Sequence, residues 1–148
     1  MKFIVTDELG RLLRWLRILG FDTVLEKNRA GLVIRSLREE RIILTRDSKI
    51  SRFTGIRTIK IDSDFVEEQL EQLIRKLNLK IDRNNIFSIC ILCNEALEPA
   101  GKNSVKGEVP EFVFETQENF TRCPKCGKIY WRGTHWALAN KFLDRMEI

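Results

Sequence analysis

Four cysteines in two close pairs are the residues of this sequence whose types and spacing point most specifically to chemistry. Cys90 pairs with Cys93 and Cys123 with Cys126, and two residues separate the members of each pair. Thiolates at this spacing can bind one ion from a tight turn, and two such turns complete a tetrahedral shell of four sulfur atoms. Gly127 follows the second pair and can supply the positive φ that such a turn favours. The spacing therefore predicts a zinc ribbon in the last third of the chain.

The other interpretation of the four cysteines is a pair of disulfides in a secreted domain. We expect a cytoplasmic location instead, because no secretory signal pattern precedes the first folded segment. Sulfur ligands also permit iron, so the choice between zinc and iron stays open. A metal whose four positions are all filled by sulfur has no place for substrate or water. The predicted metal is therefore structural, and the function must be sought elsewhere in the chain.

A second group of residues, all acidic, follows four short apolar runs. Its members are Asp7 and Glu8, then Glu26, then Asp47, and finally Asp62 and Asp64. A single acid at a helix start usually caps the helix, so the argument rests on their joint occurrence. Carboxylates in one cleft repel one another, and a divalent cation such as Mg²⁺ or Mn²⁺ relieves that repulsion. A cation held in this way can activate water and stabilise a phosphoryl transition state, so the pattern indicates a nuclease.

Competing catalytic chemistries have less support in the sequence. No glycine-rich phosphate loop follows the first apolar run, and no Gly-x-Ser-x-Gly motif occurs. His135 is the only histidine, so catalysis by a Ser–His or Cys–His pair would have to use it. All four cysteines are better explained as metal ligands.

The elements that must position the acids alternate between strand and helix. The patterns predict strands at 2–6, 21–25, 42–44 and 57–61, and helices at 9–19, 30–40 and 64–77. Such alternation predicts a parallel sheet covered by helices on both faces. In such a sheet the reactive crevice lies beyond the carboxyl ends of the strands, where the acids occur. A polar stretch at 78–85 has no periodicity, and we expect two domains, 1–82 and 83–148.

Several side chains should define the predicted helices. Leucines at helical spacing should form the buried face of the first helix, and Gly20 should end that helix. In the second helix, Leu37 should point inward. In the third helix, Phe65 should point inward, and Ser63 or Asp64 should cap its first turn. The leucines of the first helix are Leu9, Leu12, Leu13, Leu16 and Leu19.

The positive charge is concentrated in the first part of the chain. The net charge is +5, and residues 1–85 carry 18 Lys and Arg against 13 Asp and Glu, whereas the rest is balanced. This asymmetry suggests that the first domain meets a polyanion, although a charge-rich solvated surface explains it equally well. No apolar run is long enough to span a membrane.

Three segments together resemble a known family. The run from Phe3 to Asp22, the motif from Ile43 to Asp47, and the run from Tyr130 to Trp136 are similar to the Mut-seven C-terminal ribonuclease family. The resemblance covers nearly the whole chain and implies a PIN-like α/β fold, with a parallel sheet sandwiched by helices and followed by a small four-cysteine zinc ribbon. It also implies metal-dependent cleavage of RNA.

The resemblance assigns one catalytic acid to Asp47. The family's first aspartate is expected where this chain has Thr6, so either Asp7 or Glu8 substitutes for it or the metal site is weakened. Asp62 and Asp64 are candidates for a further ligand because of their position after the fourth strand. The leading hypothesis is thus an endoribonuclease with structural zinc and catalytic Mg²⁺ or Mn²⁺.

Basic and aromatic residues could contact the RNA. The predicted RNA-binding residues are Arg11, Arg14, Arg17, Arg46, Arg132 and His135. Tyr130, Trp131 and Trp136 offer planes on which unstacked bases could lie, although Trp131 is expected in the core of the ribbon. The arginines near the N-terminus could equally form a solvated helix face.

Two other functions remain open at this point. The chain could be a non-catalytic RNA-binding or ribosome-associated zinc protein that meets rRNA, and Thr6 is the main support for that alternative. PIN-like nucleases also serve as toxins paired with antitoxins, but the sequence indicates no protein partner.

Overall fold

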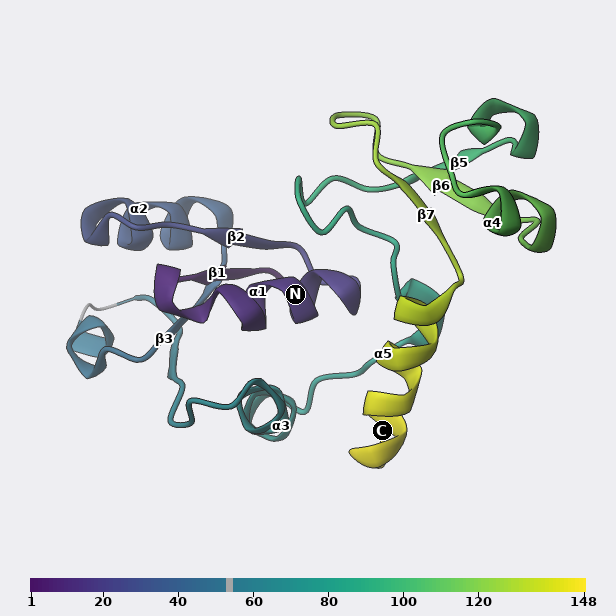
Figure 1. Ribbon diagram of the computed structural model, residues 1–148. Coiled ribbons are helices and arrows are strands. Elements are labelled where there is room, and N and C mark those ends of the chain that lie inside the picture. Colours follow the sequence, from purple (N-terminus) through teal and green to yellow (C-terminus); the bar gives the residue numbers. More distant parts are fainter. Residues whose placement is uncertain (53–54) are drawn as a thin grey trace. The chain divides into compact units, whose positions relative to one another are not determined.

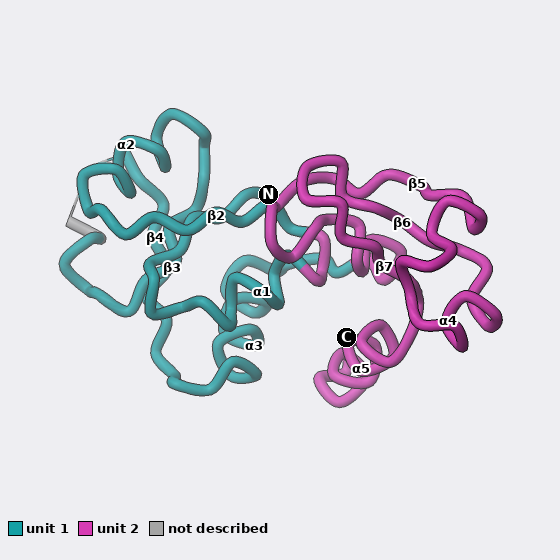
Figure 2. The backbone as a smooth tube through the Cα atoms, turned by 45° about the horizontal axis from the view of Figure 1, so that its top comes forward, with its two compact units in different colours: residues 1–17, 21–81 teal, residues 18–20, 82–148 magenta. Residues whose placement is uncertain are grey.

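The computed structural model describes residues 1–52 and 55–148, apart from the side chains of residues 51 and 52. The chain divides into two compact units (Figure 2). Unit 1 contains residues 1–17 and 21–81, and unit 2 contains residues 18–20 and 82–148.

Unit 1 is built on a sheet of four parallel strands in the order β2-β1-β3-β4. Its strands are β1 (Phe3–Val5), β2 (Thr23–Leu25), β3 (Ile42–Thr45) and β4 (Thr58–Lys60), and its helices are α1 (Gly10–Ile18), α2 (Arg29–Glu39) and α3 (Val66–Leu77). Two 3-10 turns, Asp7–Leu9 and Ser48–Arg52, follow β1 and β3. Every predicted strand and helix of this unit is present, with bounds that shift by one or two residues. The predicted parallel sheet is confirmed.

Helices flank the sheet of unit 1, with α2 on one side and α1 and α3 on the other (Figure 1). Ile4 and Ile43 are paired in register and pack with Leu32 of α2, so they face the same side of the sheet. All five leucines predicted for the inner face of the first helix are buried. Gly20 ends that helix with φ +91°, as expected for a residue that must be left-handed.

Two predictions about the helices of unit 1 are wrong. Phe65 is 70% exposed, because α3 begins at Val66, two residues later than predicted, and Phe65 is its N-cap rather than part of its inner face. Leu37 is 52% exposed, since the buried face of α2 runs through Leu32 and Ser36. Ser63 accepts a hydrogen bond from the N–H of Phe65 at 3.0 Å, so it stabilises the turn before the helix instead of capping its first turn.

Unit 2 contains an antiparallel sheet of three strands, in the order β5-β6-β7. Its elements are β5 (Glu98–Ala100), α4 (Glu111–Thr116), β6 (Phe120–Arg122), β7 (Ile129–Trp131) and α5 (Thr134–Arg145), with 3-10 turns at Arg83–Asn85 and Lys102–Val105. Val105, Val113 and Phe120 form a small core, against which Trp131 packs. The core role expected for Trp131 is confirmed.

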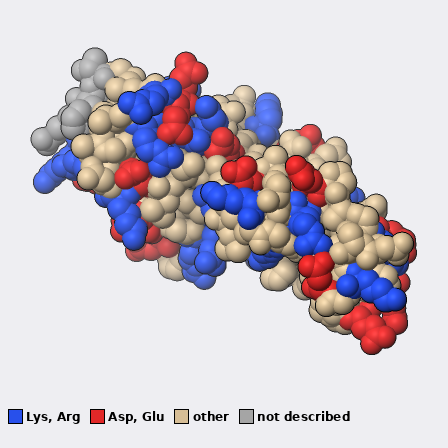
Figure 3. Space-filling model, turned by 90° about the horizontal axis from the view of Figure 1, so that it is seen from above, with Lys and Arg blue, Asp and Glu red and all other residues tan. Residues whose placement is uncertain are grey.

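Charged side chains of both signs are interspersed on the face drawn in Figure 3. None of the described helices is both long enough and apolar enough to cross a membrane.

Candidate metal centre and carboxylate hollow

The four cysteines converge in unit 2. Their sulfur atoms all lie within 4.8 Å of one another, and Cys90 and Cys123 are buried while Cys126 is exposed. Among the residues that the structure describes, these four are the only group of three or more Cys, His, Asp or Glu whose ligand atoms come this close. The arrangement can hold a metal ion such as zinc, which takes four sulfur ligands in a tetrahedron.

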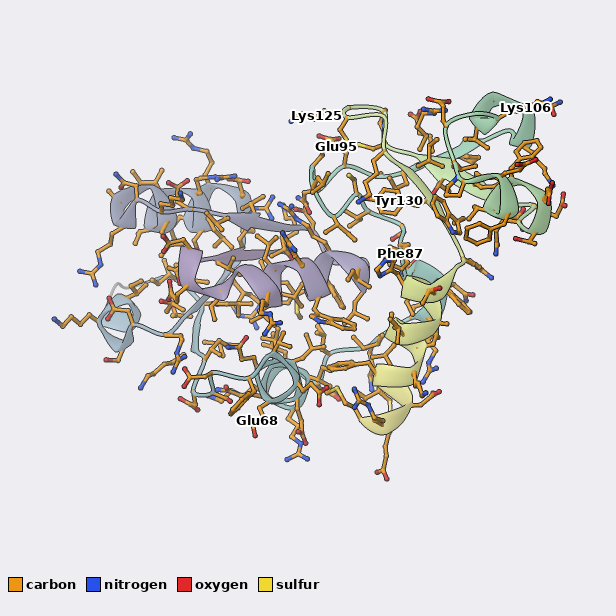
Figure 4. The ribbon with its side chains drawn as sticks, viewed as in Figure 1. Glu68, Phe87, Glu95, Lys106, Lys125 and Tyr130 are labelled. Carbon is orange, nitrogen blue, oxygen red and sulfur yellow. The ribbon has the colours of Figure 1, made fainter. Side chains whose placement is uncertain are left out.

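Both cysteine pairs are shaped by the same local turn. In each turn the N–H of the first cysteine donates to the carbonyl five residues later, and its own carbonyl accepts from the N–H four residues later. The two partners are Glu95 and Asn94 for Cys90, and Lys128 and Gly127 for Cys123. The residue four positions after the first cysteine has a left-handed backbone conformation in both turns, with φ 61° at Asn94 and φ 78° at Gly127. The predicted role of Gly127 is confirmed, and asparagine, which also tolerates this conformation, replaces glycine in the first turn. In Figure 4, Glu95 and Lys125 mark the two turns.

Tyr130 supports the cysteine cluster from β7. Its hydroxyl accepts a hydrogen bond from the N–H of Ile91 at 3.0 Å and lies 3.2 Å from Cys90 Sγ, to which it can donate when that sulfur is ionised. Burial opposes ionisation of Cys90, but the hydrogen bonds from Tyr130 and from the N–H groups of Cys93 and Leu92 outweigh it and lower its pKa to about 7. Burial and the bond to the sulfur raise the pKa of Tyr130. No pattern in the sequence indicates this contact.

The electrostatics of the cluster favour a bound cation. Burial, thiol hydrogen bonds with Cys126 and Cys123, and the negative charge on Cys90 raise the pKa of Cys93 to about 12. Four thiolates so close together therefore cannot all ionise near neutral pH without a positive ion between them. The donor set fits a metal ion.

The carboxyl ends of β1, β2 and β3 meet at a hollow of about 220 Å³ in unit 1, called here the carboxylate hollow. The chain passes from β1 to β2 on one side and then crosses to β3 on the other, so β1 and β3 flank the switch point at which such sheets bind ligands. Thr6 Oγ1 and Thr45 Oγ1 are 3.4 Å apart at this point. The acids of the first three strand ends line the hollow, namely Asp7, Glu8, Glu26 and Asp47.

Glu8 turns back toward Thr6. Glu8 Oε1 accepts hydrogen bonds from Thr6 Oγ1 and, at 3.3 Å, from the N–H of Arg46. Burial raises the pKa of Glu8, but these bonds and one from its own N–H outweigh burial and lower the pKa below the ordinary value. Glu8 thus brings a carboxylate oxygen next to the position at which the family's first aspartate was expected. Asp7 is exposed at the rim of the same hollow.

Asp47 is held in place by three contacts. Asp47 Oδ1 accepts from the N–H of Lys49 at 2.8 Å, its own N–H donates to Thr45 Oγ1 at 3.1 Å, and Arg29 pairs with Oδ2. The Lys49 hydrogen bond and the charge of Arg29 lower the pKa of Asp47, so it is ionised at neutral pH. Arg29 and Lys27, which also line the hollow, were not predicted as site residues. Their position directly after the acid of the second strand end, Glu26, was the available signal.

The acids after the fourth strand do not line the carboxylate hollow. Asp64 forms an ion pair with Arg46, which also approaches the carbonyl of Asp62 at 3.5 Å. Asp62 Oδ2 accepts from Gln72 Nε2 at 3.1 Å. The carboxylate of Asp64 is 78% exposed. The structure thus brings Asp7 and Asp47 together with Glu8, and it places Asp62 and Asp64 around Arg46.

The six predicted RNA-binding residues have different surroundings. Arg11 and Arg14 are exposed on α1, whereas Arg17 is half-buried and donates to the carbonyl of Thr23 at 2.9 Å, which ties the helix to β2. In unit 2, Arg132 and His135 are exposed and line two different hollows. Arg46 lies among the acids described above.

The chain was compared with known proteins. A family model described as the Mut7-C RNAse domain matches residues 1–143, which is nearly the whole chain. Neither a curated protein nor a solved structure matches the chain.

Proposed function

Because this chain belongs to the Mut7-C RNAse domain family, we propose that it is a divalent-metal-dependent endoribonuclease. Membership of the family suggests a ribonuclease-type function with RNA as the substrate. The observation that carries the finer proposal is the meeting of Asp7, Glu8 and Asp47 at the switch point of the parallel sheet. Carboxylates from separate strand ends around one hollow suit the hydrolysis of a phosphodiester bond.

The carboxylate hollow fits Mg²⁺ or Mn²⁺. Mg²⁺ is bound in proteins through one or two carboxylates together with waters and substrate phosphates, so Glu8 and Asp47 would be sufficient, with Asp7 at the rim. A cation held there would offset the charge of the phosphodiester and lower the pKa of the attacking water. Asp62 and Asp64 would have to leave Gln72 and Arg46 in order to join such a site.

The basic residues of the carboxylate hollow have a complementary role in this proposal. Arg29 forms an ion pair with Asp47. If Asp47 held a divalent cation, the guanidinium of Arg29 would be available to the phosphate of the substrate. Lys27 lines the same hollow and adds a second positive charge. Arg11 and Arg14, exposed on α1, would contact the RNA backbone.

For the cysteine cluster we propose a structural zinc ion held by all four sulfur atoms. Its role would be to stabilise the three-stranded sheet of unit 2, because a centre with four sulfur ligands has no open position. The sheet would then present Arg132 to the RNA.

The direct test is cleavage of labelled single-stranded and structured RNAs by the full-length protein. It would be run after dialysis against metal-free buffer and again with added Mg²⁺ or Mn²⁺. We expect cleavage only with the added cation. Asp47→Asn should reduce the rate at least about 100-fold, since an anionic ligand of the divalent cation is lost. RNA affinity should stay the same or rise, because a negative charge is removed. Asp144→Asn, an exposed aspartate of α5, is the matched control and should keep full activity.

The second candidate function is that of a non-catalytic RNA-binding or ribosome-associated protein. Thr6 in place of an acid and the Arg29–Asp47 pair favour it, because both reduce the negative charge available to a cation. Tight RNA binding without cleavage, by the unaltered protein and by Asp47→Asn alike, would establish this alternative and overturn the nuclease.

A further inference from the structure

The three-stranded sheet of unit 2 has two faces of different character. Phe120 and Trp131 lie directly opposite each other on β6 and β7 and pack into the small core with Val105 and Val113. Successive residues of a strand point to opposite faces, so the residues between them must point away from this core. One face of the sheet therefore packs on the small core, whereas Tyr130 of the other face packs with Phe87 and the cysteine cluster.

The second face forms the floor of a hollow of about 400 Å³, called here the sheet hollow. Pro99, Thr121 and Tyr130 are cross-strand partners in the middle of the sheet, and the residues two positions away share their face. These floor residues are Leu97, Pro99, Asn119, Thr121, Tyr130 and Arg132. Phe87, Trp131 and Trp136 add further rings to the lining, and Phe87 lies 5.9 Å from Tyr130 between ring centroids (Figure 4). The volume is within the range of small-molecule sites, roughly 300 to 1,000 Å³.

The sheet hollow combines aromatic surfaces with neutral polar groups. Asn84, Ser88, Asn119 and Thr121 line it, and no Asp or Glu is among its lining residues. The indole Nε1 of Trp136 is buried and has no hydrogen-bond partner in the part of the chain that the structure describes. A donor buried this deeply is out of reach of a ligand, so the polar contacts that the hollow offers come from its four neutral side chains.

One positive charge in the sheet hollow is available to an anion. Arg132 lies over the ring of Trp136 at 5.1 Å and forms no ion pair with any described carboxylate. The neighbouring Arg122 and Lys102, by contrast, are paired with Glu108 and Glu118. A guanidinium stacked on an indole keeps its N–H groups free at the edge, where a phosphate can accept from them.

We propose that the sheet hollow binds one unstacked nucleotide of single-stranded RNA. The base lies between the aromatic side chains, the amide of Asn119 meets its polar edge, and Arg132 meets its phosphate. Proteins recognise single-stranded RNA by this combination of stacking, edge contacts and a cation, and an apolar peptide would not require it. The proposal rests on RNA as the substrate of the proposed function and extends it from cleavage to the selection of unpaired strands.

The test measures RNA binding to the full-length Asp47→Asn protein, without added divalent cations, by fluorescence anisotropy. The probe is a labelled six-nucleotide single-stranded RNA, and it is compared with the same RNA in which the middle nucleotides lack their bases. Both RNAs carry the same phosphates, so the comparison isolates the contribution of the base. We expect the intact RNA to bind about tenfold more tightly, since stacking of a single base contributes this much.

Variants of the sheet hollow locate the effect. Trp136→Ala should remove the preference for intact RNA, and Arg132→Gln should weaken binding of both RNAs to a similar degree. Arg145→Gln is the matched control for Arg132, because Arg145 also lies over a ring, that of Phe142 at 5.7 Å, and does not line the hollow. Asn103→Ala controls in the same way for Asn119→Ala. If Trp136→Ala does not fold, as judged by circular dichroism, Trp136→Phe and Asn119→Ala carry the test, and each should reduce the preference for intact RNA.

The outcomes separate the sheet hollow from the nuclease. Equal binding of intact and abasic RNA, or a preference that survives in the hollow variants, would overturn the base site. Base-dependent binding by a protein that never cleaves RNA would keep the base site and overturn the nuclease. Cleavage by a protein that binds both RNAs equally would support the nuclease and overturn the base site.

Discussion

The cysteine cluster of unit 2 and the carboxylate hollow of unit 1 differ in how far their ligand atoms are assembled. The four sulfur atoms already lie within 4.8 Å of one another. The carboxylates of Asp7, Glu8 and Asp47 line one hollow, yet in the described part of the chain no three acids come as close. The cysteine cluster already has its four ligand atoms close together, whereas carboxylates of the hollow are bound to other side chains of the protein.

The difference follows from what positions each ligand. Each cysteine pair is shaped by a turn of six residues, so its geometry is fixed locally. Glu8 and Asp47 follow different strands, and each has another partner, with Thr6 donating to Glu8 and Arg29 pairing with Asp47. Such exposed contacts are individually weak and can be exchanged. A site that must admit substrate therefore keeps exchangeable partners, while a structural site does not.

Removal of one sulfur ligand should have the largest effect. Cys123→Ser should abolish metal binding and unfold the three-stranded sheet, because structural zinc contributes about 10 to 16 kcal/mol in small zinc domains. The four-stranded sheet of unit 1 has its own core and should remain folded. Metal content by mass spectrometry and hydrogen exchange of peptides from each unit would measure both effects. Leu92→Ser, which changes an exposed residue within the first turn, is the control and should keep the metal. Full metal content in Cys123→Ser would contradict the assignment of Cys123 as a metal ligand.

The second effect concerns the hydroxyl that supports the cluster. Tyr130→Phe keeps the ring but removes the donor to Cys90 Sγ, so the metal affinity should fall about 10- to 100-fold, as for other groups that orient a ligand. Competition with a chelator of known affinity measures this change. Thr121→Val removes a hydroxyl from the cross-strand neighbour and should leave the affinity unaltered. Unchanged affinity in Tyr130→Phe would mean that the contact does not act on the metal centre.

This contrast also explains what could be predicted from the sequence. The spacing of the cysteines and Gly127 defined the centre in unit 2, because its turns are local. The alternation of apolar runs and leucine spacing predicted the sheet and helices of unit 1 for the same reason. The contact of Tyr130 with Cys90 joins residues 40 positions apart and depends on strand register, which no short pattern encodes.

The acids were predicted as a set, but their grouping was not. The order β2-β1-β3-β4 places the ends of β1 and β3 side by side and β4 at the edge. The sequence shows the four strand ends but not this order, so Asp64 could not be separated from Asp47 in advance. The pairing of Arg29 with Asp47 was missed because it joins residues 18 positions apart that follow different strands.

Restoring an acid at position 6 should make the carboxylate hollow more like the cysteine cluster. Thr6→Asp places a second carboxylate beside Glu8, so the affinity for Mn²⁺ should rise about tenfold with the added ligand charge. Without a divalent cation, the repulsion between the two acids should lower the melting temperature. Electron paramagnetic resonance of free Mn²⁺ measures the affinity. Thr6→Asn has nearly the same shape and no charge, and a similar gain in that variant would show that charge is not the cause.

The smallest effect should come from the arginine that forms an ion pair with Asp47. Arg29→Gln removes a cation that competes for the carboxylate, so the pKa of Asp47 should rise toward its ordinary value. The affinity for Mn²⁺ should increase up to about fivefold, the range expected for loss of one exposed ion pair. Carbon-detected nuclear magnetic resonance follows the Asp47 carboxyl during titration. Arg75→Gln breaks the exposed pair with Glu71 on α3 and is the control.

RNA affinity should fall in Arg29→Gln even as Mn²⁺ affinity rises, and these opposite directions distinguish an exchangeable partner from a merely structural one. If both affinities fell together, Arg29 would be part of the framework of the hollow, and the contrast with the cysteine cluster would lose its basis.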